Sequence, residues 1–362
     1  MKALLVSINS IYELTGGGLY LRCLHSEISS NYSSVDILCK KCVDKKQAFF
    51  LSSSNINFVD KTKLADVISR FILSPSFLMF YFIRIFFISK DYDAIHFHSS
   101  RNALLAIIFK LITRKKVVIH FDNVEYSLSR SLMKDGMFIL RAFDAFIMYF
   151  YEKFAIKALG IKSSFITIND KRLLGYIDAD IHPIKVSSSM KEFPFKWLEK
   201  RSCSRHRGIF VASFSHYPNV LAFENLKLVA KSMPDTQFVV AGRGAEFLLN
   251  DLSNIEIYSD VSSELLMELY CSSTFCLALV NEGSGMKTKV AESMSYNLPV
   301  IASKHALIGY DEVVNNQLVY LVNELDDISN AILDIHRIYL NQNAYKIFFK
   351  YWQSFLDNYH IK

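Results

Sequence analysis

Short apolar runs alternate with helix-length segments along the first half of the chain. The runs are rich in β-branched and aromatic residues, which is typical of strands buried in a parallel sheet. The expected strands are Ala3–Ile8, Val35–Cys39, Ile56–Val59, Ala94–His98, Val117–His120 and Phe165–Ile168. The segments between them predict helices over Leu19–Ser29, Asn102–Ile112 and Met137–Leu159. The alternation predicts a first Rossmann-like α/β domain over residues 1–190.

Residues 181–206 differ from this pattern, because Pro183, a serine run and Pro194 precede a charged stretch. We interpret them as a linker between domains. A second alternating series follows, with expected strands Gly208–Ser213, Gln237–Ala241, Ile255–Tyr258, Thr274–Val280, Pro299–Ser303 and Leu318–Val322. It predicts a second Rossmann-like domain over residues 205–340 and a helix over 341–362. The expected fold class is α/β, with two doubly wound domains that face a central cleft.

Composition narrows the classes of partner. The 362 residues are 51% hydrophobic and carry a formal net charge of +6. That charge is too small and too scattered to indicate nucleic acid, but it is compatible with an anionic membrane surface. The six cysteines show no disulfide framework, so we expect a reducing compartment. Cys271 and Cys276 lie in or beside apolar segments, so we interpret them as small core residues. Cys39-Lys40-Lys41-Cys42 has no second pair, so metal binding or redox work is not favoured there.

Phe71–Ser89 is the one candidate for a membrane span. Phe, Ile, Leu, Met and Tyr dominate it, but Pro75, serines and Arg84 interrupt the apolar run. A span normally needs about 20 apolar residues with few charges. We therefore favour a helix that is buried in the first domain or partly faces a membrane.

The most informative segment is the glycine-rich turn Gly283-Ser284-Gly285, which leads through Lys287 into a helix-forming stretch. Glycines let backbone amides approach a ligand, and a helix start adds unpaired N–H groups and a positive dipole end. Lys289 and Glu292 are three residues apart and share a helix face. Amides and lysines suit a diphosphate, and a carboxylate suits the vicinal hydroxyls of a ribose. The segment therefore indicates a nucleotide-sugar ligand.

These residues also resemble a known family. The glycine turn, Lys289, Glu292 and the trailing Pro299-Val300 are similar to the donor-binding signature of family-four (group 1) glycosyltransferases of the GT-B fold. The resemblance is good over residues 205–305 and loose over the amino half. It implies a metal-independent, configuration-retaining enzyme that needs no cofactor, because the nucleotide-sugar is a substrate. It also implies that the helix over 341–362 crosses back to the first domain.

The chain departs from the better-known members at two places in its second half. Ser284 stands where they have a first Glu, and Glu282 lies two residues upstream. The loop after the strand Gly208–Ser213 lacks the Arg and Lys that many relatives place there. Charge neutralisation of the diphosphate then depends on Lys287, Lys289, the helix dipole and Arg243, which follows the next strand.

In the first domain, two loops are candidates for the cleft side. Gly16-Gly17-Gly18 follows the first strand, and the resemblance implies a loop on the acceptor side, where Arg22 either reaches a ligand or is a surface residue. The run from His120 through Asp122 to Glu125 leaves a strand end, and polar residues there point to function. Relatives often have His and Asp exchanged in this turn, so either His120 or Asp122 faces the transferred sugar.

Three other motifs are weaker. His98 borders the expected acceptor side but suits a structural histidine as well, and His96 shares its face. Asp178-Ala179-Asp180 mimics a metal-binding Asp-x-Asp, but it does not follow a nucleotide-binding strand, so we expect no metal. Gly16–Gly18 lacks the GxGxxG spacing of a redox dinucleotide site.

The function that we expect is transfer of a sugar, of the hexosyltransferase type, from a nucleotide-sugar to a glycan or lipid-linked acceptor in cell-surface polysaccharide synthesis. Stabilising the departing nucleoside diphosphate would supply most of the catalysis. If the enzyme instead inverts configuration, Asp122 or Glu125 is the candidate base. The alternatives are a GT-B-like epimerase, a non-catalytic nucleotide-sugar-binding subunit and an integral membrane protein.

The expected location is cytoplasmic, with peripheral attachment to the inner face of the plasma membrane. The chain offers two aromatic-rich segments, Phe71–Ile88 and Met137–Leu159, with basic residues among them. Such helices bury aromatic side chains at the interface and place cations at anionic headgroups. The alternative is that both segments pack in the core of the first domain.

Overall fold

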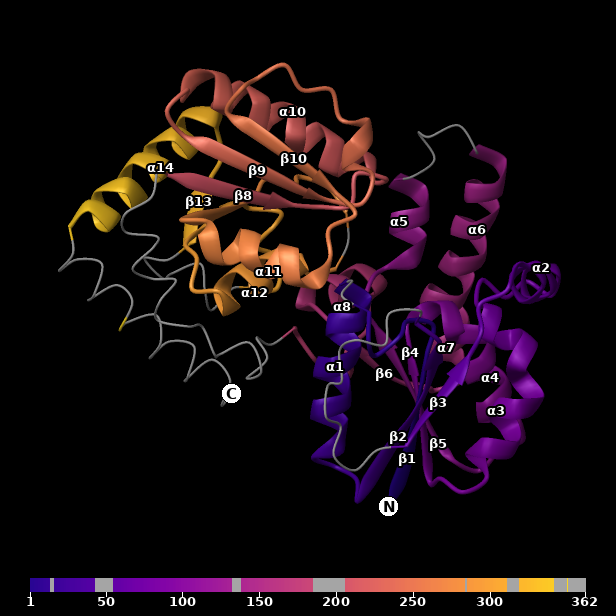
Figure 1. Ribbon diagram of the computed structural model, residues 1–362. Helices are drawn as coiled ribbons and strands as arrows, with labels where there is room; N and C mark the ends of the chain where they lie inside the picture. The colour runs from indigo at the N-terminus through magenta and orange to yellow at the C-terminus, as the bar shows by residue number, and fades with distance from the viewer. Residues whose placement is uncertain are drawn as a thin grey trace. The chain divides into compact units, whose positions relative to one another are not determined.

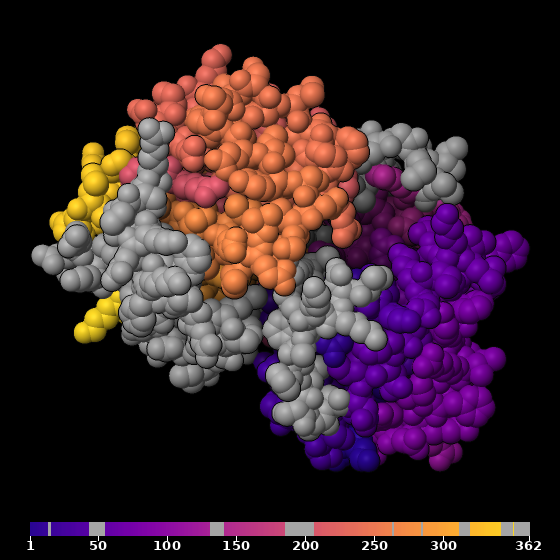
Figure 2. All heavy atoms as spheres, viewed as in Figure 1, coloured from indigo at the N-terminus to yellow at the C-terminus, as the bar shows by residue number. Residues whose placement is uncertain are grey.

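The computed structural model describes residues 1–13, 16–42, 55–131, 138–184, 206–283, 285–310, 319–341 and 350. By its contacts the chain divides into two units, which we describe separately (Figure 1). Unit 1 comprises Met1–Ile184 and Gly283–Met286, and unit 2 comprises Lys185–Glu282 and Lys287–Lys362. Figure 2 shows that side-chain atoms fill the spaces between the ribbons within each unit.

Unit 1 is built on a seven-stranded sheet in the order β3-β2-β1-β4-β5-β6-β7, and every pair is parallel. The order reverses between β1 and β4, so the loops after these two strands diverge to opposite faces. The strands are β1 (Lys2–Ser7), β2 (Ser34–Lys40), β3 (Ile56–Val59), β4 (Ala94–His98), β5 (Lys116–Phe121), β6 (Lys162–Phe165) and β7 (Asp180–Ile181).

Helices cover both faces of this sheet, with α1 on one side and α3 and α4 on the other (Figure 1). They are α1 (Gly16–Ser29), α2 (Lys63–Phe71), α3 (Phe82–Ser89), α4 (Ala103–Ile112), α5 (Glu125–Ser131), α6 (Phe138–Phe150), α7 (Ile156–Ala158) and α8 (Ile168–Leu174). Side-chain caps fix several starts; for example, the hydroxyl of Thr62 accepts from the N–H of Ala65 at 3.1 Å. A π-helical turn, Tyr151–Ala155, joins α6 to α7.

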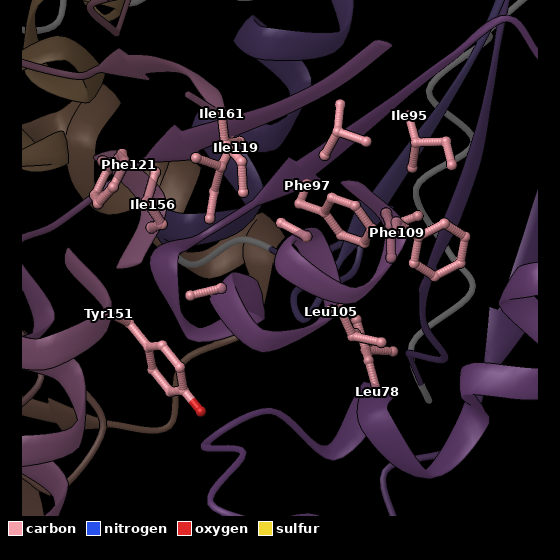
Figure 3. Close-up of a cluster of buried hydrophobic side chains, with 14 of the residues drawn as sticks. Leu78, Ile95, Phe97, Leu105, Phe109, Ile119, Phe121, Tyr151, Ile156 and Ile161 are labelled. Carbon is pink, nitrogen blue, oxygen red and sulfur yellow. The ribbon is translucent and has the colours of Figure 1, made fainter. Parts of the chain in front are cut away.

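The core of unit 1 lies between the sheet and the helices opposite α1. Phe97, Ile119 and Phe121 from the strands meet Phe109 of α4 and Ile156 of α7, and all five are fully buried (Figure 3). Such close-packed aromatic and branched side chains stabilise the fold through apolar burial.

Unit 2 has a six-stranded parallel sheet in the order β10-β9-β8-β11-β12-β13, with the reversal between β8 and β11. Its strands are β8 (Arg207–Val211), β9 (Gln237–Gly242), β10 (Ile255–Ser259), β11 (Phe275–Ala278), β12 (Val300–Ser303) and β13 (Val319–Val322). Its helices are α10 (Tyr217–Ser232), α11 (Ser263–Ser272), α12 (Thr288–Ser295) and α14 (Leu325–Leu340). Figure 1 shows α10 on one face of the sheet and α11 and α12 on the other.

The two doubly wound parallel sheets confirm the predicted fold class. Two predicted elements were wrong. The expected strand Phe165–Ile168 is displaced, because β6 runs over Lys162–Phe165 and Ile168 already starts α8. The segment Phe71–Ile88 is no single helix, because α2 ends at Phe71 and a short 3₁₀ helix, Phe77–Tyr81, precedes α3. The predicted linker and the predicted helix over 341–362 lie largely outside the described residues.

Candidate functional site

The first candidate site lies at the carboxyl end of unit 2's sheet, where the strand order reverses between β8 and β11. In open parallel sheets, ligands bind at such a switch point. The chain leaves β11 at Ala278 and turns through Gly283 and Gly285 before α12 begins. Both glycines have positive φ, 107° and 70°, so a side chain at either would be strained. Ser284 lies outside the described residues.

Lys289 lies in the first turn of α12 and is buried. Within the described part of the chain, its Nζ has no hydrogen-bond partner, and it sits 4.9 Å from the centroid of the Phe210 ring. Burial lowers the pKa of Lys289 to about 8. A buried ammonium without a hydrogen-bond acceptor among the described residues is costly, and an anion at the start of α12 would remove that cost.

Glu292 is held one helical turn further along α12. Its Oε2 accepts a hydrogen bond from the Tyr270 hydroxyl at 3.0 Å. Tyr270 is buried and stacks on Tyr296 with 4.8 Å between ring centroids. This support fixes the carboxylate on the same helix as Lys289, as the spacing predicted.

The other two predicted donor cations differ in placement. Lys287 is the N-cap residue of α12, and its carbonyl accepts from the Tyr310 hydroxyl at 2.9 Å. Arg243 follows β9 and is exposed. Its carbonyl accepts the N–H of Phe214 at 2.8 Å, which ties the loop after β9 to the loop after β8.

In unit 1, Asp122 follows β5 and forms the centre of a buried polar cluster. Its Oδ2 lies 3.7 Å from His98 Nε2. Asp122 Oδ1, His98 Nε2 and the hydroxyl of Tyr20 have no hydrogen-bond partner within the described residues. Burial raises the pKa of Asp122 to about 6 and lowers that of His98 to about 3. The cluster presents unmatched polar atoms to a ligand.

Gly285, which belongs to unit 1 by its contacts, lies against the same turn. A Cβ on Gly285 would come within 2.4 Å of Asn123 Oδ1 and 2.7 Å of the Asp122 carbonyl oxygen. Only glycine permits this approach. The structure thus brings together two motifs that are more than a hundred residues apart in the sequence.

Glu125 is engaged by a partner that the sequence did not reveal. Its Oε2 lies 2.8 Å from Arg101 Nη2, and this carboxylate raises the pKa of Arg101. Glu152, also missed, accepts the N–H groups of Glu125 and Tyr126 at 2.9 and 3.1 Å and so caps α5. The polar run after β4 that contains Arg101 was an available sequence signal, whereas Glu152 lay inside a predicted helix and gave none.

His120 of β5, two residues before Asp122, lies within a hydrogen-bonded chain. Its Nε2 is 2.8 Å from His96 Nδ1, and its Nδ1 is 2.6 Å from the Ser164 hydroxyl. Burial lowers the pKa of both histidines, that of His96 to about 3. Both ring nitrogens of His120 are engaged, whereas Asp122 Oδ1 has no hydrogen-bond partner among the described residues.

The glycine loop of α1 packs against the loop after β1. A Cβ on Gly17 would come within 1.9 Å of Asn9 Nδ2, and one on Gly18 within 2.1 Å of the Glu13 carbonyl oxygen. Arg22 donates to the carbonyls of Ile11 and Glu13 at 2.9 and 2.8 Å. These contacts give the glycines and Arg22 a role in shaping that loop, and a role toward an acceptor stays a prediction.

Two kinds of feature are absent from the described residues. No three His, Cys, Asp or Glu side chains there are arranged to hold a metal ion. No helix in that part of the chain has the length and apolarity needed to cross a membrane.

Comparison with known proteins identifies the second half. The family described as "Glycosyl transferases group 1" matches residues 205–337. No curated protein sequence matches the chain.

Solved structures match almost the whole chain at low identity. Sucrose-phosphate synthase from Thermosynechococcus elongatus has a TM-score of 0.67 at 11% identity, over 99% of this chain and 94% of that one. HepE from Anabaena, in complex with UDP, has a TM-score of 0.64 at 12% identity, over 99% and 95%. The catalytic domain of starch synthase IV from Arabidopsis thaliana, bound to ADP and acarbose, has a TM-score of 0.66 at 10% identity, over 99% and 98%. The chain is therefore a glycosyltransferase of the GT-B fold, and residues 205–337 form its group 1 glycosyltransferase domain.

Proposed function

We propose that the protein transfers a sugar from a nucleotide-sugar, bound by unit 2, to a glycan or lipid-linked acceptor, bound by unit 1. The observation that carries the proposal is the buried Lys289 ammonium, which has no hydrogen-bond partner in the described residues. Nucleoside diphosphates are bound by the similar structures of HepE and starch synthase IV, which supports the same class of ligand here.

The donor's parts are assigned by charge and geometry. The diphosphate lies at the start of α12, where backbone N–H groups, Lys289 and Lys287 neutralise it. We assign the ribose hydroxyls to Glu292, whose carboxylate is held in place by the hydrogen bond from Tyr270. Arg243 lies on the neighbouring loop as a further cation. These groups stabilise the departing nucleoside diphosphate, which is where negative charge develops during transfer.

Asp122 is the residue of unit 1 that we assign to the reacting sugar. Its buried, unpartnered Oδ1 accepts a hydrogen bond from a sugar hydroxyl. The family-four resemblance implies retention of configuration without a metal ion, and Asp122 then positions the sugar. Were the enzyme to invert configuration, the raised pKa of Asp122, about 6, would suit a general base.

A peripheral membrane surface on unit 1 would deliver a lipid-linked acceptor, as cell-surface polysaccharide synthesis requires. Large apolar side chains are exposed on α2, α3 and α6, among them Phe71 (89% exposed), Ile83 (69%) and Phe146 (69%). These helices lie on the face of the sheet opposite α1 (Figure 1). Exposed basic residues, including Arg84 and Lys90, lie among them. Apolar contact combined with cations suits the cytoplasmic face of an anionic membrane.

Nucleotide binding tests the donor site. Thermal shifts against UDP, GDP, ADP and dTDP identify the nucleotide, because a ligand that binds the folded state stabilises it. Glu292→Gln should then weaken nucleotide affinity roughly ten- to hundredfold, since a charge-assisted hydrogen bond contributes about 1.5–3 kcal/mol. Lys289→Ala should weaken it more than the matched control Lys287→Ala. Equal, small effects of the two lysine variants would exclude Lys289 from the site.

Flotation with liposomes tests the membrane surface. The protein should float with anionic vesicles at low salt and be released at high salt. Phe71→Ser and Phe146→Ser should reduce flotation, whereas Phe247→Ser, which changes an equally exposed side chain of unit 2, should not. Protein that stays at the bottom with anionic vesicles at low salt indicates a soluble acceptor.

A further inference from the structure

One face of unit 1's sheet turns polar toward β5, β6 and β7. His120 of β5 pairs in register with Ser164 of β6, which pairs with Asp180 of β7, and Lys162 pairs with Val118. Parallel sheets of this kind are usually apolar on both faces, because helices cover them. On the opposite face the same strands present Ile119, Phe121 and Phe165 to the core (Figure 3). Packing of apolar side chains against helices therefore does not explain the polar side chains on this face.

This polar face lines a cavity of about 440 Å³ between the sheet and the second half of α1. The volume falls within the roughly 300–1,000 Å³ that is typical of small-molecule sites. Lys116, Lys162 and Asp180 are the first residues of their strands, so the cavity extends toward the amino ends. Asp122 follows the carboxyl end of β5. The cavity is thus distinct from the cluster around Asp122.

The floor of the cavity is a fixed, uncharged chain of hydrogen bonds. It runs from the Tyr32 hydroxyl to His96 Nε2 (3.1 Å), from His96 to His120 (2.8 Å) and from His120 to the Ser164 hydroxyl (2.6 Å). The two imidazole rings stack with 5.1 Å between centroids and 10° between planes. Every nitrogen of both buried imidazoles is engaged, so they are not free to bind a metal, and the half-buried Tyr32 ring supplies apolar surface beside them.

The rim mixes opposite charges. Lys116, Lys162 and the terminal ammonium of Met1 contribute cations, and Glu27 and Asp180 contribute carboxylates. Lys162 and Asp180 are 3.0 Å apart, and Lys116 lies 5.8 Å from the centroid of the Tyr32 ring. Hydroxyl groups suit such a mixed rim, because each of them donates and accepts at once.

We propose that this cavity binds a neutral saccharide unit at a second site, separate from the reaction centre. Ring surfaces contact its C–H face, and the mixed rim binds its hydroxyls. The proposal rests on the proposed function only in that a glycosyltransferase handles glycans. A growing or product chain held there remains attached to the enzyme between transfers. His120 links the cavity to the Asp122 turn two residues further on, so occupancy is able to influence that turn.

Saturation-transfer NMR and calorimetry with the methyl glycosides of glucose, galactose, mannose and N-acetylglucosamine test the site on the full chain. At least one glycoside should bind saturably. Asp180→Asn and Lys116→Gln should each weaken that binding about tenfold, the effect of losing one charge-assisted hydrogen bond. The matched exposed controls Asp91→Asn and Lys110→Gln should leave it unchanged. All four changes are on the surface, and circular dichroism checks that each variant is folded.

Three results would overturn the proposal. The first is the absence of saturable binding across the panel. The second is inorganic phosphate displacing the glycoside, which would indicate an anion site. The third is loss of glycoside binding in Glu292→Gln or on adding a nucleoside diphosphate, which would place the sugar in the donor site. Glycoside binding that depends on Asp180 in a protein that binds no nucleotide would refute the proposed function while leaving this cavity supported.

Discussion

Nucleoside diphosphate binding should draw a proton onto Lys289. In the free protein, burial lowers the pKa of Lys289 from its ordinary 10.5 to about 8. That difference corresponds to about 3 kcal/mol of disfavour for the charged form. An anion at the start of α12 provides the missing partner and returns the pKa toward its ordinary value.

The number of protons taken up on binding equals the fraction of Lys289 that is neutral in the free protein. With a pKa of about 8, that fraction is roughly 0.1 at pH 7 and roughly 0.8 at pH 8.5. Binding at pH 8.5 should therefore take up close to one proton, and binding at pH 7 almost none. The last proton of a phosphate titrates near pH 6, so the nucleotide contributes nothing at pH 8.5.

Calorimetry at pH 8.5 in two buffers with different heats of ionisation measures this uptake directly. Lys289→Met, which keeps the chain length and removes the charge, should abolish the uptake. Lys287→Met is the control and should preserve it. Uptake near zero at pH 8.5 in the wild-type protein, or equal uptake in Lys289→Met, would refute the assignment of Lys289 to the diphosphate.

The same shift has a consequence for stability without ligand. The folded-state pKa of Lys289 lies below its unfolded value, so between about pH 8 and 10.5 the unfolded chain binds more protons. The contribution of Lys289 to the free energy of unfolding should therefore increase as the pH rises from about 8 to about 10.5. Urea unfolding of wild-type protein and Lys289→Met, compared at pH 8 and pH 10, measures the difference in slope.

Three further predictions concern unit 1 and are measured by urea unfolding. Gly18→Ala should destabilise by about 1–3 kcal/mol, because its Cβ would overlap a backbone carbonyl, although alanine favours a helix; a stabilising result would contradict the packing. Glu152→Ala should cost at least about 2 kcal/mol, because two backbone N–H groups of α5 lose their acceptor, and an effect below about 0.5 kcal/mol would exclude the cap. Burial lowers the pKa of His96 to about 3, so the unfolded chain binds more protons than the folded one between about pH 3 and 6.5. The free energy of unfolding should therefore decrease as the pH falls through this range, and His96→Gln should reduce the slope of that pH dependence by about one proton.

The regular part of the fold was predictable because apolar runs mark buried strands. Ile56–Val59 and Ala94–His98 match β3 and β4 residue for residue. The prediction failed at β6 for a physical reason. Lys162 and Ser164 face the polar cavity, so β6 contains no continuous apolar run. The apolar residues that follow, through Ile168, led to a predicted strand that begins three residues after the actual one.

The sequence allowed us to predict which residues share a helix face after the glycine turn, but not which residues distant in the sequence form ion pairs or helix caps. Lys289 and Glu292 lie three residues apart on one helix, so their shared face followed from spacing alone. The ion pair of Arg101 with Glu125, and the cap that Glu152 provides, join residues that only the fold brings together. Cys271 and Cys276 are both buried, as their places in or beside apolar segments predicted.

Unmatched polar atoms mark the carboxyl edge of each sheet. Folded proteins satisfy the great majority of their buried polar groups, so an exception calls for a ligand or water. Among the described residues, such groups include Lys289 in unit 2 and the cluster of Tyr20, His98 and Asp122 in unit 1. Each lies at a strand end of a doubly wound sheet, the position where such sheets bind ligands. The cation in unit 2 suits an anionic diphosphate, and the uncharged imidazole with a carboxyl group in unit 1 suits neutral hydroxyl groups. Under the proposed function, a ligand that binds at either edge offsets the cost of the unmatched groups there and so stabilises the folded protein.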